Sequence, residues 1–241
     1  MQLPTETGSK KYTIAEGFFE TGVSENLCKL FISDLRDFTV YSLYNDLSNK
    51  LLAYKLIRRN EEMEEPWLTA AFLKTIRVDF NPDTEIIPDK FSEGQMNDAD
   101  GDSISLYPPS ANGYMHYAKG LFKYNAILED NLKVYLFRQD LNLVIYIFKG
   151  RNCCFSNTFV CQNETEMLYF ILSSLQLSDN TQDNAVVYLD YYLASDPEFT
   201  RFIRQYFRSV KNMKPLMADP DPEIPFLSEL LFPNYLLSLC V

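Results

Sequence analysis

Hydrophobic residues along the chain gather in short runs that are typical of β-strands, and the runs come in threes. The first half has three runs rich in β-branched and aromatic residues, at 27–32, 38–44 and 51–57. The second half has three that are nearly continuously apolar, at 132–138, 141–148 and 152–160. Continuous apolar runs are expected for strands that are buried on both faces of a sheet. We therefore predict three consecutive strands in each half.

A helical spacing follows each set of strands. In the first half, Pro66 suits a first helical turn, and the apolar stripe after it is Leu68, Ala71, Phe72, Thr75 and Ile76. In the second half, the helix over 163–177 has one face formed by Leu168, Ile171, Leu172 and Leu175. Short strands are expected after these helices, at 84–88 and 184–192.

A third helix is predicted over 195–210, in "SDPEFTRFIRQYFRSV". Ser195 can cap it, Glu198 completes a capping box, and Pro197 lies near its start. Its apolar stripe consists of Phe199, Phe202, Ile203, Tyr206, Phe207 and Val210.

Both halves thus show the order strand, strand, strand, helix, strand, which indicates an internal repeat. A meander whose helix crosses over to a further strand gives a mixed sheet covered by helices. Two such units form the α/β plan of the actin-like ATPase fold, a pair of duplicated ribonuclease H-like subdomains. We predict a peripheral segment at 1–22, a first subdomain at 23–125 with a long acidic loop at 89–112, and a second subdomain at 126–241.

Composition narrows the class of protein. The 241 residues are 46% hydrophobic, which is ample material for a core, and carry a net charge of −11, which disfavours nucleic acid as a partner. No apolar run reaches the ~18 residues that span a bilayer, and the N-terminus lacks the apolar region of a signal peptide. We expect a soluble cytoplasmic protein without membrane insertion.

The five cysteines form no C-x-x-C motif, so reduced thiols are expected. They are Cys28, Cys153, Cys154, Cys161 and Cys240. The simplest interpretation is that they are small buried residues on strands.

The stretch "GRNCCFSNTFVCQNETEMLYFILSSLQL" resembles a bacterial family of unknown function, domain of unknown function 3822. In that family a strand ends in Asn-x-Phe, and a helix begins with an acidic residue before Leu-Tyr-Tyr. The matching positions here are Asn157, Phe159, Glu166, Leu168, Tyr169 and Phe170. The family usually has Asp where this chain has Glu166 and Tyr where it has Phe170. "TEIIPDKF" and "LLSLCV" resemble two further signatures of the family.

That family resembles actin-like ATPases, and particularly the type IV pilus assembly protein of that fold. The resemblance covers most of 27–241 and implies a bacterial protein of this fold, with no activity that can be carried over.

Two hairpin turns are the candidate nucleotide site, since in active actin-like ATPases the corresponding turns contain Asp-x-Gly. Their glycines let backbone N–H groups approach the phosphates. Here the first turn is Ser33-Asp34-Leu35-Arg36-Asp37 and the second is Arg138-Gln139-Asp140-Leu141-Asn142. Each contains an acid and neither contains a glycine. We therefore favour a plain hairpin tip over a divergent nucleotide site built from Ser33, Asp34 and Asp140.

Other candidate motifs are weaker. Asp98, Asp100 and Asp102 suggest a calcium loop, but Ser103 and Pro109 stand where an EF-hand needs Gly and Glu. His116 is the single histidine, so it cannot build a multi-histidine metal site. A basic run around the third helix is most simply a solvated face, with an acidic-protein or nucleic-acid contact as the alternative. It comprises Arg201, Arg204, Arg208, Lys211 and Lys214.

The sequence thus predicts a non-catalytic adaptor or scaffold with an unidentified protein partner, no catalytic residue, no metal site and no cofactor. The alternative is an actin-like protein that binds ATP and Mg²⁺ in an altered site. The sequence leaves open which residues would hold a cofactor, and it does not give the oligomeric state.

Overall fold

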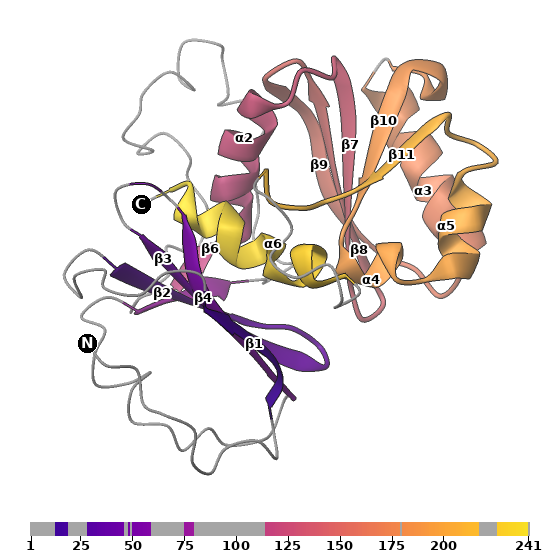
Figure 1. Ribbon diagram of the computed structural model, residues 1–241. Helices are drawn as coiled ribbons and strands as arrows, with labels where there is room; N and C mark the ends of the chain where they lie inside the picture. Colours follow the sequence, from indigo (N-terminus) through magenta and orange to yellow (C-terminus); the bar gives the residue numbers. More distant parts are fainter. Residues whose placement is uncertain are drawn as a thin grey trace. The chain divides into compact units, whose positions relative to one another are not determined.

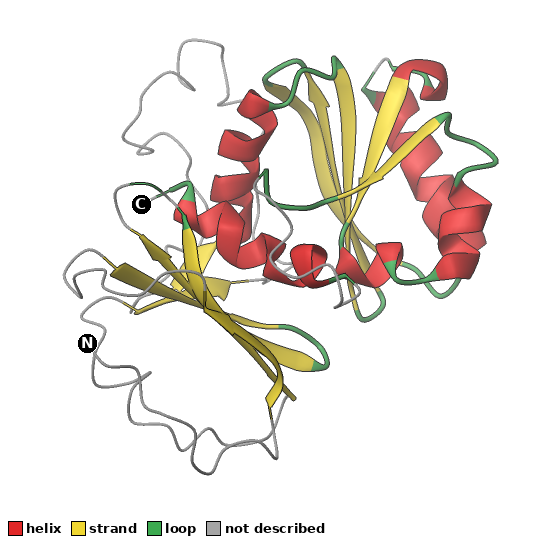
Figure 2. Cartoon of the chain, in the orientation of Figure 1, coloured by secondary structure: helices red, strands yellow, loops and turns green. Residues whose placement is uncertain are grey.

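The chain divides into two compact units, which Figure 1 and Figure 2 show as a computed structural model. The structure describes residues 13–18, 28–45, 48, 50–58, 75–79, 114–178, 180–216 and 226–240. The first unit contains 1–80, 110–120 and 215–241, and the second contains 81–109 and 121–214. The boundary at 120/121 lies inside one helix, α2 (Tyr117–Ile127).

The first unit has a six-stranded mixed sheet in the order β1-β4-β3-β2-β5-β6. Its strands are β1 (Thr13–Phe18), β2 (Cys28–Asp34), β3 (Phe38–Asn45), β4 (Leu51–Arg58), β5 (Thr75–Asp79) and β6 (Tyr114–His116). The strands β2, β3 and β4 form the predicted antiparallel meander, and β5 and β6 add to it in parallel. β1 was not predicted, since it lies within the segment expected to be peripheral, yet it pairs antiparallel with β4.

The helix predicted to end at Thr75 and Ile76 is wrong at those two residues, because both lie on β5. The segment "TIRVD" alternates apolar and polar side chains, and β-branched residues favour a strand. β5 pairs in parallel with β2, at residues for which the sequence predicted the end of a helix. The strand predicted at 84–88 stays a prediction. Those residues, and most of the predicted helix, lie outside the described part of the chain.

The C-terminal helix α6 (Leu227–Ser238) belongs to the first unit, which corrects the expectation that 126–241 forms one subdomain. Nearly every side chain of α6 is buried. The fully buried Asn234 fixes the helix to the sheet, because its Nδ2 donates to the Phe31 carbonyl at 3.3 Å, the Val40 carbonyl at 3.1 Å and Ser42 Oγ at 2.9 Å. A segment distant in sequence thus completes the first core.

Replacing Asn234 by alanine is expected to destabilise the first unit by about 2 kcal/mol, since buried acceptors lose their donor and a small cavity forms. Urea unfolding monitored on the wild type and the variant measures this. Ser238→Ala is a matched control on the same helix, because Ser238 is also buried but donates only to the Tyr235 carbonyl one turn earlier. Equal losses for the two variants would contradict the anchoring role of Asn234.

The second unit has a five-stranded sheet in the order β11-β10-β7-β8-β9. Its strands are β7 (Leu132–Gln139), β8 (Asn142–Lys149), β9 (Asn152–Val160), β10 (Ala185–Leu189) and β11 (Ser209–Asn212). β7, β8 and β9 form an antiparallel meander, and β10 and β11 extend it in parallel beyond β7. The order matches that of β4-β3-β2-β5-β6 in the first unit.

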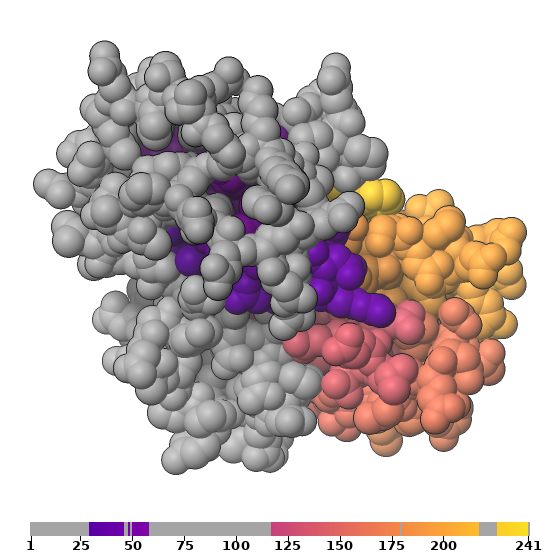
Figure 3. Space-filling view, turned by 90° about the horizontal axis from the view of Figure 1, so that it is seen from below, coloured from indigo at the N-terminus to yellow at the C-terminus, as the bar shows by residue number. Residues whose placement is uncertain are grey.

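Helices cover both faces of this second sheet. They are α2, α3 (Glu164–Leu177), α4 (Tyr191–Ala194) and α5 (Pro197–Ile203), while the exposed 3-10 turn η3 (Gln182–Asn184) leads into β10. An aliphatic core joins one face to α3 and α5, and aromatic contacts such as Phe122 with Phe148 join the other face to α2. Figure 1 shows α2 on one side of the sheet and α3 and α5 on the other. In Figure 3 the atoms of this unit, magenta to orange, form a contiguous surface. Burial on both faces explains the continuous apolar runs of the strands.

The predicted helix over 195–210 is wrong in both its cap and its length. Asp196 is the N-cap, because its Oδ1 accepts from the amides of Glu198 and Phe199 at 3.0 Å, while Ser195 ends α4. The helix stops at Ile203, and Val210 lies on β11. The apolar spacing continued past the helix because Phe207 of the following turn is buried and Val210 belongs to an edge strand.

Among the described residues, no helix is long and apolar enough to cross a membrane.

Candidate functional site

The first candidate turn is a tight connection whose polar groups bind within the hairpin. β2 ends at Asp34 and β3 begins at Phe38, and the Leu35 amide donates to the Phe38 carbonyl at 2.8 Å. Thr39 Oγ1 donates to Asp34 Oδ1 at 2.9 Å. Leu35 is buried, so its side chain fixes the turn to the core of its own unit. The Asp34 carboxylate is exposed, and one of its oxygens is held by the opposite strand.

Ser33, the other candidate in this turn, points into the protein. Its side chain has an exposed fraction of 0%, and it lies opposite Val40 in the β2–β3 register. The serine hydroxyl is therefore withdrawn from any ligand that approaches from solvent.

The second candidate turn has a strained backbone where a glycine would be relaxed. Asp140 adopts a φ of 55°, in the left-handed region that Asp tolerates better than most residues. The Asp140 carbonyl accepts a hydrogen bond from Arg138 Nε at 3.3 Å, and the Leu141 carbonyl accepts from the Cys161 amide at 2.7 Å. Contacts within the unit therefore bind two carbonyl groups of this turn.

Asp190 is the residue of this region that the sequence did not reveal. It follows β10 and caps α4, and its Oδ1 accepts from the Leu193 amide at 3.0 Å. Its Oδ2 accepts from the Arg138 amide at 2.8 Å, across a separation of 52 residues in the chain. The Asp190 amide in turn donates to the Leu136 carbonyl at 3.1 Å. A carboxylate of the protein thus binds the backbone N–H where the second turn begins.

Burial has a strong effect on this carboxyl. It raises the pKa of Asp190 to about 7, although hydrogen bonds from the Leu193 and Arg138 amides act to lower it. Backbone N–H groups at the end of a strand and at a helix N-terminus are the groups that cradle phosphates in nucleotide-binding proteins. Here Asp190 already accepts from them, and an incoming phosphate would meet a carboxyl group in their place.

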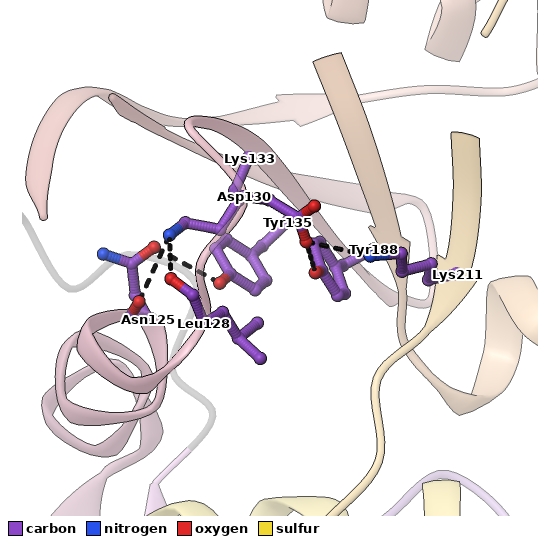
Figure 4. Close-up of polar contacts among 7 residues, drawn as sticks. All are labelled: Asn125, Leu128, Asp130, Lys133, Tyr135, Tyr188 and Lys211. Atoms are coloured by element: carbon purple, nitrogen blue, oxygen red, sulfur yellow. Dashed lines mark hydrogen bonds and ion pairs between the residues drawn. The ribbon is translucent and has the colours of Figure 1, made fainter. Parts of the chain in front are cut away.

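A second polar network lies at the other end of β7 and holds elements of the unit together (Figure 4). Asp130 accepts a hydrogen bond from the Tyr188 hydroxyl, and it forms an ion pair with Lys211 Nζ at 2.9 Å. Lys133 is buried, and its Nζ donates to the Asn125 carbonyl at 3.2 Å and the Leu128 carbonyl at 3.0 Å. The network ties the C-terminal end of α2 to the sheet.

The pKa shifts of Lys133 and Asp130 agree with a structural role for the network. Burial lowers the pKa of Lys133, and the nearby Asp130 acts in the opposite direction. For Asp130, burial acts to raise the pKa, but the hydrogen bonds from Tyr188 and Lys211 and the charge of Lys211 outweigh it and lower the pKa. Lys133 is 1% exposed, so its amine has no access to a substrate.

The remaining predicted candidates form no site within the residues that the structure describes. Asp98, Asp100 and Asp102 lie outside the described residues, as does the loop at 89–112. His116 is on β6, opposite Asp79 in the strand register. No group of three His, Cys, Asp or Glu side chains that could hold a metal ion occurs in the part of the chain that the structure describes.

The basic run is also divided between elements. Arg201 lies on α5, Arg208 forms an exposed ion pair with Asp183 at 4.0 Å, and Lys211 lies on β11, paired to Asp130. It is therefore not one face of a single helix, which corrects the predicted arrangement.

The described cysteines are unpaired thiols of mixed exposure. Cys153 and Cys161 are buried as expected, whereas Cys154 is exposed and Cys240 is half-buried. Burial raises the pKa of Cys161 to about 11, which opposes formation of a reactive thiolate.

Comparison with known proteins supports the fold. No family model and no curated protein matches the chain. A solved structure from Bacteroides thetaiotaomicron, of a protein with actin-like ATPase fold and unknown function, is 14% identical with a TM-score of 0.57, over 78% of this chain and 91% of that chain. This likeness shows that the chain has the actin-like ATPase fold, as predicted.

Two further solved structures are less similar. The ethanolamine utilization protein EutJ from Carboxydothermus hydrogenoformans is 8% identical with a TM-score of 0.45, over 89% of this chain and 90% of that chain. An exopolyphosphatase from Cytophaga hutchinsonii is 9% identical with a TM-score of 0.39, over 88% of each chain. Neither likeness extends the assignment beyond the fold.

Proposed function

We propose that the chain is a non-catalytic actin-like protein that works as an adaptor or scaffold for another protein in the bacterial cytoplasm. The observation that carries the proposal is the hydrogen bond from the Arg138 amide to Asp190. Through this bond, the backbone N–H group at the start of the second turn already donates to a carboxylate of the protein, so it is not available to a phosphate.

Three further features support the same conclusion. Neither turn contains a glycine, so side chains stand where phosphates need a bare backbone. The Ser33 hydroxyl is buried. Leu35 fills the first turn with an apolar side chain that belongs to the core. A fold that has lost its phosphate contacts in this way still presents a large folded surface to a protein partner.

The alternative is a divergent ATP and Mg²⁺ site. The feature in its favour is that Asp34 and Asp140 are both exposed acids in the two turns, and carboxylates are ligands that Mg²⁺ prefers. Under this alternative exposed carboxylates of the turns would bind Mg²⁺, and the protein would act as a nucleotide-dependent switch.

Magnesium-dependent release of phosphate from ATP tests the proposal directly. We expect wild-type protein and the Asp34→Ala variant to give the same rate as a blank without protein. Turnover by the wild type that disappears in Asp34→Ala would overturn the proposal in favour of the alternative. Arg36→Ala is a control substitution in the same turn, since Arg36 is exposed and its side chain is a cation that does not bind Mg²⁺.

A further inference from the structure

The outer sides of α3 and α5 belong to one surface of the second unit. Both helices pack on the same face of the sheet through a shared core cluster, and they lie in contact with each other. Figure 1 shows them side by side on that face. Leu172 of α3 and Phe202 of α5 are half-buried and pack against the same cluster. The two helices therefore present one outer layer to solvent.

The α3 half of this layer exposes large apolar side chains. Leu177 is 75% exposed and Tyr169 is 65% exposed. Residues 167–178 contain no charged side chain, although the chain as a whole is 23% charged. The acids of α3, Glu164 and Glu166, both lie in its first turn. Tyr169 and Leu177 lie about 12 Å apart along the helix axis, so two turns of a second helix could cover both.

The α5 half of the layer carries positive charge. Arg201 lies in the last turn of α5 and Arg204 is its C-cap, so the two guanidinium groups extend from neighbouring positions on the helix. Both side chains are exposed, and neither guanidinium forms an ion pair within the part of the chain that the structure describes. The acids of α5, Asp196 and Glu198, lie at its opposite end. Two unpaired cations thus lie beside an uncharged apolar strip, on a chain whose net charge is −11.

We propose that this surface docks an acidic amphipathic helix of a partner protein. The α3–α5 surface, as we name it, consists of Tyr169, Leu172, Leu177, Arg201, Phe202 and Arg204. Apolar side chains of the partner helix cover the α3 half, and its carboxylates pair with the two arginines. A helix has the complementary shape, because the side-chain ridges of one helix pack into the grooves of others. The inference rests on the proposed scaffold function, and it names the chemistry of the partner.

The charge pattern favours an acidic protein segment over other polyanions. A nucleic acid or an anionic membrane extends dense negative charge far beyond two arginines, where it would meet a chain with a net charge of −11. A helix with a few carboxylates can pair with the two arginines alone. It also offers apolar side chains to Leu177, which the backbone of a nucleic acid does not.

Fluorescence anisotropy on the full chain tests this inference with a labelled synthetic helix of about 20 residues, which is long enough to be helical alone. The peptide carries leucines at the spacing i, i+3, i+4 and i+7. It is made in three versions, with glutamate, glutamine or lysine at the positions that flank the leucines. We expect the glutamate version to bind roughly tenfold more tightly than the glutamine version, because two ion pairs form. The lysine version should not bind.

Variants of the chain locate the binding. In Arg201→Glu/Arg204→Glu the preference should reverse, so that the lysine version binds and the glutamate version does not. Leu177→Ser should weaken binding of the glutamate version by roughly fivefold or more, since apolar contact is lost. All three side chains are exposed, so these changes leave the core intact. Lys119→Glu/Lys123→Glu is the matched control, because it changes the charge equally on α2, which covers the other face of the sheet, and it should keep the wild-type preference.

Three outcomes would overturn the inference. One is a glutamate version that binds no more tightly than the glutamine version, or does not bind at up to about 1 mM. Another is an arginine double variant that keeps the wild-type preference, or a lysine double variant that loses it. The third is a single-stranded oligonucleotide or a phosphatidylserine vesicle that binds the wild type more tightly than the peptide and does not bind the arginine double variant. That result would assign the surface to nucleic acid or to membrane.

This test and the test of the proposed function fail separately. Magnesium-dependent turnover of ATP would overturn the proposed function without affecting peptide binding, which is measured in the absence of nucleotide. A peptide that fails to bind would leave the turnover assay unaffected. It would remove the α3–α5 surface as the docking site and not the scaffold function.

Discussion

Replacing Gly120 by alanine is expected to destabilise the first unit by about 3 kcal/mol or more, the upper range for overpacking a core. Gly120 is on α2, and a Cβ built on it would overlap the carbonyl group of Leu236 in α6. Both groups that collide are attached to backbone, so rotation of a side chain cannot relieve the overlap. The two helices would have to separate, which would disturb the burial of α6. Urea unfolding of the wild type and the variant measures the loss.

Gly150→Ala is the matched control for this experiment. Gly150 has a φ of 61°, and nothing lies within 4 Å of a Cβ added there. The alanine would therefore suffer backbone strain alone, about 1–2 kcal/mol. If Gly120→Ala costs no more than Gly150→Ala, the close approach of α2 and α6 is not what Gly120 provides.

The second large effect is a fall in stability as the pH rises through the range in which Asp190 titrates. The folded state raises the pKa of Asp190 to about 7, whereas its ordinary value is 3.8. Between these values the folded protein binds a proton that the unfolded chain has released. The free energy of unfolding should therefore decrease with rising pH, by up to about 1.4 kcal/mol for each pH unit. Below pH 3.8 and above about 7 this contribution is flat.

The Asp190→Asn variant isolates this contribution, since its amide resembles the protonated acid and does not titrate. Subtracting the unfolding free energy of the variant from that of the wild type cancels every other titrating group. The difference should become steadily less favourable to the wild type from pH 4 to pH 7. A difference that is constant, or that grows with pH, would show that the carboxylate is not disfavoured by its surroundings.

Sequence patterns predicted the strands of both meanders, because their β-branched and aromatic runs depend on local preference and burial. They could not predict α6, since this helix is buried all round and contains Pro233, so it shows no polar face. β5 and the end of α5 were misassigned because an apolar spacing continues along the chain through a change of secondary structure. The spacing of apolar residues alone therefore does not show where a helix ends and a strand begins.

The candidate site was predictable only in part. The missing glycines of the two turns are visible in the sequence, and they gave the preference for a plain hairpin. The burial of Ser33 depends on which face of β2 meets α6, a helix almost two hundred residues later. The bond between Asp190 and the Arg138 amide joins the end of β10 to the end of β7. No short motif marks such a contact, so Asp190 could be found only in the folded protein.

The most direct test of the central claim is thermal unfolding with and without Mg-ATP and Mg-ADP, read against a matched magnesium control. A nucleotide at about 100 times its dissociation constant would stabilise the folded state by about 2.7 kcal/mol. For a chain of this size each kcal/mol moves the midpoint by roughly 2–4 °C, so binding would be easily detected. The account predicts no shift with either nucleotide. A shift that is abolished by Asp34→Ala would contradict it and would show that the first hairpin is a working nucleotide site.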